Sequence, residues 1–355
     1  MKHNPKNRRT KEPKVDRRVT AFLWCFGALV LALPTALCSQ DTVIYSTAPD
    51  PAARIKKTGV ILEFTGTELR LRNTLRTEET IPAARVVEVQ TQWIATHQAG
   101  RAARSEGRLD DAIAALRQAK RDETRPWVVR QIMADLVGCY LESGRIDSSG
   151  DEFLGILASD PVARHFDVIP IAWRGAAIGA PAEARAGVWL AARNMPAAAL
   201  LGASWLLATR RNEATAALEE IAKLNDPRLS GLATIQLWRT KLVTATLDDI
   251  RRWQTQLEKM PTEIQAAGWY ILGDCFSRLD QAEAASLAYL KVPILFRGQR
   301  VMAADALLAA GKQLEKMSQA GSAANLYREL IRDYPHLATA SEAEGRLEKL
   351  NVAIR

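Results

Sequence analysis

The sequence has few of the residues and none of the motifs that common enzyme classes use. Only four histidines occur in 355 residues, and three of them follow the N-terminal segment: His97, His165 and His336. None has a carboxylate at metal-ligand spacing, and no Gly-x-Ser-x-Gly elbow or Gly-rich phosphate loop occurs. The paired acids at 110–111 and 248–249 precede apolar helical patterns, where carboxylates cap a helix and complement its dipole. We therefore expect no catalytic activity, no cofactor and no bound metal.

Cysteine is equally scarce, with four in the chain. Cys25 and Cys38 lie in the N-terminal apolar segment, which leaves Cys139 and Cys275. In the repeat pattern described below these two stand four units apart, which is too far for a disulfide. We expect them to be small, apolar core residues, rather than redox or metal-binding groups.

Positive charge is concentrated at the N-terminus. The whole chain carries a formal charge of +8, but the first 18 residues hold eight Lys or Arg against Glu12 and Asp16. The remainder therefore carries only +2. Nucleic-acid binding needs clustered charge that neutralises phosphates, so we expect no nucleic-acid partner.

One long apolar run occurs, from Ala21 to Leu37, and it directly follows the basic residues. A basic stretch followed by an apolar stretch is typical of a signal peptide or N-terminal anchor, here residues 1–40. Small residues favour cleavage near 38–40, and the stretch from Thr35 to Cys38 faintly resembles a lipoprotein box. The segment is cleaved, lipidated or kept as a membrane attachment at 21–37. In each case we expect an exported protein of the periplasm or cell envelope.

Residues 41–92 predict a small β module. Val60 to Phe64 and Glu68 to Arg72 flank a turn that contains Gly66, as in a hairpin. Shorter strand patterns surround Val43 to Tyr45, Thr80 to Pro82 and Val86 to Val89. We expect an antiparallel sheet or SH3-like barrel of four or five strands, which caps the helices that follow or binds a ligand itself.

The rest of the chain, residues 93–350, shows a helical pattern that repeats. Near its end, Leu307 and Gly311 line one helix, Ala323 and Tyr327 line a second, and Pro335 ends it. The equivalents of Gly311 are Gly100, Val137, Ala172, Gly202, Leu237 and Gly273. Sixteen positions after each of these seven residues, Gly311 included, a large residue follows: Leu116, Phe153, Val188, Leu218, Trp253, Tyr289 and Tyr327. Successive units are 30 to 38 residues long, and the short unit leaves the register open within 165–235.

This pattern resembles the tetratricopeptide repeat (TPR), a helix–turn–helix unit of 34 residues. The resemblance implies a mainly α fold, in which six or seven helix hairpins stack as an α-solenoid behind the β module. In that family the first helix of each unit lines an inner, concave face. The matching positions here, which we predict to bind a partner, are His97, Arg101, Arg104, Trp238, Lys241, Tyr270, Asp274, Arg278 and Lys312.

These observations favour a non-catalytic scaffold in the cell envelope that binds a protein or peptide on the concave face. A structural or assembly role through self-association is a second hypothesis, because the final unit also resembles repeats of periplasmic assembly factors. An enzyme with its site in the β module, near Arg70 and Arg76, is a third. The oligomeric state stays open.

Overall fold

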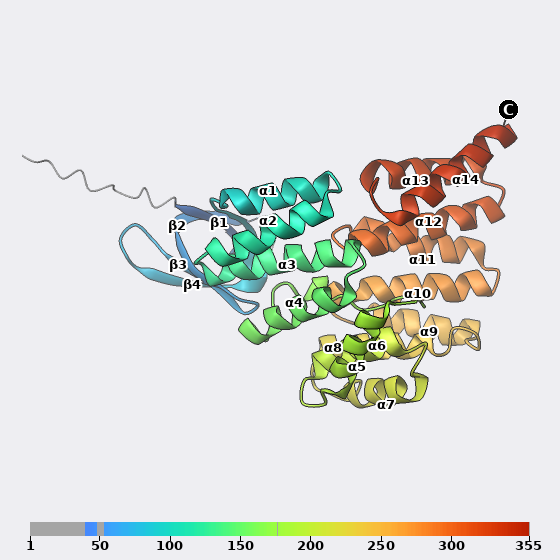
Figure 1. The fold of residues 1–355 in the computed structure, drawn as a ribbon, viewed down its shortest axis with the longest axis horizontal. Helices are drawn as coiled ribbons and strands as arrows, with labels where there is room; N and C mark the ends of the chain where they lie inside the picture. The colour runs from blue at the N-terminus through green and yellow to red at the C-terminus, as the bar shows by residue number, and fades with distance from the viewer. Residues whose placement is uncertain (1–39, 48–52, 176, 355) are drawn as a thin grey trace, which may run out of the picture. The chain divides into compact units, whose positions relative to one another are not determined.

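The computed structural model describes residues 40–47, 53–175 and 177–354 (Figure 1). The predicted signal segment, with Cys25 and Cys38, lies outside the described residues apart from Gln40. The described part is mainly helical, with 64% helix in fourteen α-helices and three short 3-10 helices, and it begins with a five-stranded antiparallel sheet. The predicted mainly α class with an N-terminal β module is therefore confirmed.

The sheet contains every strand that the sequence predicts. The strands are β1 (Asp41–Ser46), β2 (Arg54–Phe64), β3 (Glu68–Arg72), β4 (Glu78–Pro82) and β5 (Val86–Gln90), in the spatial order β4-β3-β2-β1-β5. In β3, Leu69 and Leu71 are buried while Arg70 and Arg72 are exposed, as the period of two in a half-buried strand requires. Arg72 pairs with Glu78 on β4 at 2.7 Å, across the register that joins the two strands.

The sheet packs against the first helices and shares a hydrophobic core with them. Leu69, Leu71 and Ile81 belong to the same buried cluster as Trp127 and Ile132. At the β2–β3 turn, the Gly66 N–H donates to Asp160 Oδ2 at 2.9 Å. A Cβ on Gly66 would lie 2.3 Å from the Val162 carbonyl oxygen, so only glycine allows this approach. The β module is thus fixed to the helical part.

The helices follow one another as neighbours, and those adjacent in sequence mostly lie side by side (Figure 1). Several begin with a proline in the first turn, where its missing N–H costs nothing. The helices are α1 (Ala95–Ser105), α2 (Leu109–Asp122), α3 (Pro126–Glu142), α4 (Ile146–Ser159), α5 (Ala180–Ala191), α6 (Pro196–Leu206), α7 (Arg211–Ile221), α8 (Pro227–Arg239), α9 (Leu247–Leu257), α10 (Gln265–Arg278), α11 (Ala282–Leu295), α12 (Arg300–Lys316), α13 (Ala320–Asp333) and α14 (Ala338–Ile354).

Helices α3 and α12 join three buried clusters into one core. Ile132 of α3 packs with the sheet, whereas the adjacent Met133 packs with α4 and the helices beyond it. Likewise Met302 of α12 belongs to the central cluster and Leu307 to the C-terminal one. Cys139 and Cys275 are both buried and free, as predicted from the sequence.

The connection between α4 and α5 corrects one sequence prediction. Residues around Val168 to Ala172 match the first helix of a repeat, but the structure has only a short 3-10 turn at Phe166–Val168 followed by irregular backbone. Pro170 removes a backbone donor, and Gly175 and Gly179 weaken any helix beyond it. Helix α5 therefore pairs directly with α6, which explains the short unit in the pattern.

Candidate functional site

Residues 170–174 of this connection, here called the strap, are held by side chains from α6 and α8. The Ala172 N–H donates to Ser204 Oγ at 3.2 Å. Gln236 Nε2 donates to the Ala172 carbonyl at 2.8 Å, and Arg239 donates to the carbonyls of Ala172 at 3.1 Å and Arg174 at 3.0 Å. The strap thus receives backbone hydrogen bonds of the kind that a bound peptide makes.

The strap also reaches α12. Trp173 Nε1 donates to Asp305 Oδ2 at 3.2 Å, and Arg174 pairs with the same oxygen at 3.2 Å. Asp305 is 2% exposed, and its burial raises the pKa of its carboxyl to about 6, although Arg174 opposes this. The inner surface between α8 and α12 is therefore filled, at least in part, by the chain's own backbone.

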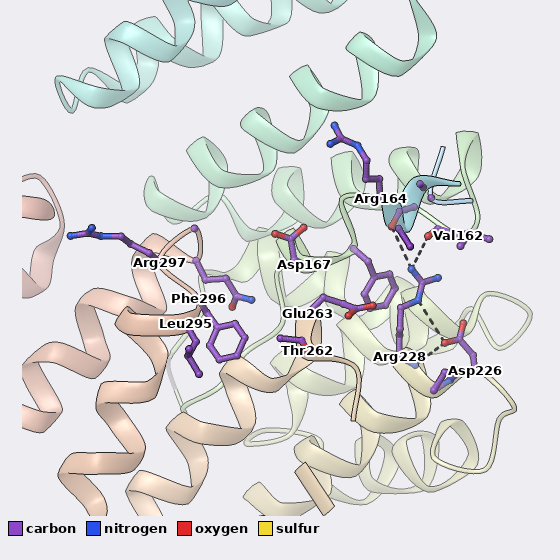
Figure 2. A pocket seen from close by; sticks show the side chains of 18 of the residues that line it. Val162, Arg164, Asp167, Asp226, Arg228, Thr262, Glu263, Leu295, Phe296 and Arg297 are labelled. Carbon is purple, nitrogen blue, oxygen red and sulfur yellow. Dashed lines mark hydrogen bonds and ion pairs between the residues drawn. The ribbon is translucent and has the colours of Figure 1, made fainter. Parts of the chain in front are cut away.

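An open cavity of about 930 Å³, the outer pocket, lies beside this filled region (Figure 2). It is bounded by the β2–β3 turn at Gly66, the α4–α5 connection and the loops that precede α8, α10 and α12. Its volume lies within the range of ligand-binding pockets. Val162 and Leu295 line it and are 46% and 60% exposed, so two large apolar groups face solvent there.

Three arginines line the outer pocket, and each has its own contacts. Arg228 lies over the Phe166 ring at 4.2 Å and donates to the Val162 carbonyl at 2.8 Å. Arg297 pairs with Asp333. Arg164 lies over the Phe64 ring of β2 at 4.3 Å. Burial lowers the pKa of Arg164.

Three acids line the same pocket, and they differ in their partners. Asp226 caps α8 by accepting the backbone N–H groups of Arg228 at 2.9 Å and Leu229 at 3.2 Å. Asp167 and Glu263 form no ion pair within the described residues. Burial raises the pKa of Asp167, and the nearby charge of Glu263 acts in the same direction.

A smaller cavity of about 240 Å³, the inner pocket, shares Asp167 and the loop residues Gly298 and Gln299 before α12 with the outer one. Its polar wall is a buried ion-pair cluster, in which Glu142 contacts Arg104 at 2.6 Å and Arg300 at 3.3 Å. His165 also lines it, and burial together with Arg164 lowers the pKa of this imidazole to about 3. The histidine is therefore neutral at physiological pH.

Of the nine predicted binding residues, only Arg104 lines either pocket. His97 is fully buried, and its Nε2 lies 2.8 Å from Asp135 Oδ2, which Arg101 also approaches at 3.9 Å. His97, Arg101 and Arg104 form one polar cluster with Asp135 between α1 and α3. The repeat pattern puts His97, Arg101 and Arg104 on one helix face. It gives no sign that Asp135 of α3 lies against that face.

The remaining predicted residues lie on α8, α10 and α12 or just beyond α8. Trp238 is buried and stacks on Trp253 at 5.4 Å, while Lys241 is exposed. Tyr270 is buried against Tyr289, whose hydroxyl donates to Asp274 at 2.6 Å. Arg278 donates to the Ala245 carbonyl, and Lys312 pairs with Glu342 at 2.6 Å. Burial raises the pKa of Asp274 to about 6. Whether they bind a partner stays a prediction.

Neither metal chemistry nor a membrane span has structural support in the described segments. Within residues 40–47, 53–175 and 177–354, no group of three His, Cys, Asp or Glu side chains is arranged to hold a metal ion. Over the same residues, no helix has the length and apolar character needed to cross a bilayer. No known protein-family model matches the chain, and no curated protein matches it significantly.

Proposed function

We propose that this chain is a non-catalytic scaffold whose TPR-like helical repeats and SH3-like β module form a binding site for a protein or peptide segment. The observation that carries the proposal is the outer pocket, which is about 930 Å³ in volume and is bordered by the exposed side chains of Val162 and Leu295. Exposed apolar groups around an open cavity are typical of interaction sites. The basic and apolar N-terminal segment supports a place in the cell envelope.

Packing between the helices supports the TPR-like interpretation. In three units the small residue of the first helix meets the large residue sixteen positions later: a Cβ added at Gly100, Gly273 or Gly311 would lie within 2.6 Å of Leu116, Tyr289 or Tyr327, respectively. In four hairpins the turn contains a residue of positive φ, namely Gly107, Gly144, Asp280 and Ser318. Recurrence of one packing contact and one turn conformation is expected of a repeat array.

In this proposal the partner segment binds at the inter-repeat loops rather than along the first helices of the units. The loops before α8, α10 and α12 all contribute residues to the lining of the pocket. Loops held by a rigid helical array bind with little ordering cost. The strap, by contrast, already occupies the inner surface near Asp305.

Site-specific photo-cross-linking tests the proposal. Benzoylphenylalanine at position 295, on the pocket rim, is expected to cross-link one discrete envelope protein in cells. The matched control is position 188 on α5, which is similarly exposed at 57% against 60% and lies outside both pockets. The captured protein, once purified, should bind the wild-type chain and bind a Val162→Lys variant at least tenfold more weakly. Equal cross-linking at both positions would remove the support for a pocket-borne site.

Self-association is a second candidate, favoured by an apolar stripe on α11. Leu287, Ile294 and Leu295 are 60%, 72% and 60% exposed and follow helical spacing. A second copy of the chain is a natural cover for such a stripe. Sedimentation velocity of the wild type and of a Leu287→Lys variant distinguishes the two candidates, because Leu287 does not line the outer pocket. A concentration-dependent dimer that this substitution dissociates supports self-association.

A further inference from the structure

We infer that the outer pocket accepts a lysine or arginine side chain of the partner segment, with its cationic end between Asp167 and Glu263. The inference rests on the proposed function, and it names the chemistry of the partner. Figure 2 shows Asp167 and Glu263 between Phe296 on one side of the pocket and Arg228 on the other. Both carboxylates line the cavity and come from different segments, the α4–α5 connection and the turn before α10.

Within the described residues, neither of these two acids forms an ion pair with the cations around the pocket. Arg297 forms an ion pair with Asp333. Arg228 donates to the Val162 carbonyl and lies over the Phe166 ring. Arg164 donates to Gln131 Oε1 at 3.1 Å; its charge acts on Asp167, but it forms no ion pair with that carboxylate. Two carboxylates in one cavity repel each other, so a ligand cation between them relieves the repulsion.

The walls of the pocket fit the rest of such a side chain. Phe296 and Leu295 line one side, and Val162 lines the opposite rim. Lysine and arginine have apolar stems that pack along such groups while the charged end stays with its acceptors. Asp167 and Glu263 are both exposed on the wall of the cavity, so the charged end of such a side chain can reach each of them. Apolar neighbours of the basic residue in the partner would cover Leu295 and Val162.

Other occupants are less compatible with these groups. An acidic segment would add a third negative charge next to Asp167 and Glu263. A neutral segment would cover the two carboxylates without replacing the water that now solvates them, which is costly. The groups around Asp167 and Glu263 therefore favour a basic side chain over an acidic or a neutral one.

Fluorescence anisotropy with short peptides tests this inference. The probes are labelled, end-capped heptapeptides of sequence Gly-Ser-Leu-X-Leu-Ser-Gly, in which X is Lys, Arg, norleucine or Glu. We expect the Lys and Arg peptides to bind at least tenfold more tightly than the norleucine and Glu peptides. The difference should shrink when salt is raised, since the contact is electrostatic. The double variant Asp167→Asn/Glu263→Gln should abolish it.

The variant Glu348→Gln is the control, because Glu348 is exposed on α14 and lines neither pocket. It changes net charge outside the site and should leave the Lys preference intact, while circular dichroism verifies that all variants fold. Tighter binding of the Glu peptide, or a Lys preference that survives the double variant, overturns the inference but leaves the cross-linking result standing. A folded protein that binds none of the peptides also overturns the inference. The cross-linking at position 295 then decides the scaffold proposal separately.

Discussion

Gly107, in the turn between α1 and α2, lies directly against the imidazole of His336, in the turn between α13 and α14. A Cβ on Gly107 would lie 2.2 Å from His336 Cγ, and the glycine has a φ of 74°. The first and last helix hairpins therefore meet at a residue that must be glycine for two reasons: backbone conformation and space. The ion pair between Glu142 and Arg300 joins α3 to α12 in the same part of the structure.

Replacing Gly107 by alanine should destabilise the protein more than replacing Gly144. Gly144 has the same conformation, with a φ of 73°, but a Cβ there meets nothing within 4 Å. Gly144→Ala thus costs only the left-handed backbone strain, about 1 kcal/mol, whereas Gly107→Ala also displaces His336. Thermal unfolding should show the lower midpoint for Gly107→Ala. In a His336→Ala background the two costs should become equal, and a persistent difference would mean that the imidazole contact is not the cause.

Arg239 should be a main support of the strap. Its guanidinium donates to the carbonyls of Ala172, Arg174 and Ser204, the last at 2.9 Å. Lysine keeps the charge but cannot span three acceptors, so we expect Arg239→Lys to lower stability by about 2–4 kcal/mol. Arg278→Lys is the matched control, because Arg278 donates to a single carbonyl. Limited proteolysis should cut near residues 170–174 in the first variant only; similar resistance of both variants would contradict the role of Arg239.

Asp305 should make stability fall as pH rises from about 4 to about 6. Its pKa is raised from 3.8 to about 6 by burial, so in this range the folded chain binds more protons than the unfolded chain. Above this range the charged carboxylate costs roughly 3 kcal/mol. Asp305→Asn keeps an acceptor for Trp173 and cannot ionise. The gain in its thermal midpoint over the wild type should therefore grow between pH 4 and pH 7.

Asp249 provides a control in which stability depends on pH in the opposite direction. Hydrogen bonds from Thr246 and Arg252 lower its pKa to about 2, so the stability it contributes is lost when pH falls from about 4 towards 2. Asp249→Asn should lose stability at pH 7 and match the wild type near pH 2. A pH-independent difference for Asp305→Asn would show that its carboxyl is not held at a raised pKa.

The thiols of Cys139 and Cys275 should be unreactive in the folded protein. Both are buried, and burial raises the pKa of each to about 12. Since the thiolate is the reactive form, labelling should require unfolding. With Cys25 and Cys38 replaced by serine, a thiol reagent should count no cysteines under native conditions and two in denaturant. Rapid native labelling of either would contradict the packing around it.

Local patterns in the sequence predicted the strands and some of the helix pairs. Leu69 and Leu71 alternate with Arg70 and Arg72, and this period is sufficient to give both the strand and its buried face. Small and large positions sixteen residues apart predicted three of the helix contacts, each within one hairpin: Gly100 with Leu116, Gly273 with Tyr289 and Gly311 with Tyr327. The prediction was wrong for Gly202, which packs on α5 against Ala186 and Leu190. The resemblance to TPR proteins depends on these same local contacts.

The strap and the outer pocket were not predictable in the same way. Ile171 and Ala172 are buried, as residues on the inner face of a helix would be. The pattern of apolar positions in this stretch therefore does not distinguish a helix from an extended backbone. The extended backbone is favoured by Pro170 and by the hydrogen bonds that Gln236 and Arg239 donate to it. Both donors are remote in sequence. The pocket likewise depends on Gly66 approaching the α4–α5 connection, a tertiary contact without a local signature.

Hydrogen exchange of the full chain with and without the Lys-centred peptide tests most directly where this protein binds its partner. We predict slower amide exchange at residues 162–167, 225–228, 262–263 and 295–299, which surround the outer pocket. We predict no change along the helix faces that hold His97, Tyr270 and Lys312. Protection confined to those faces, with unchanged exchange in the four loop segments, would contradict the pocket as the binding site.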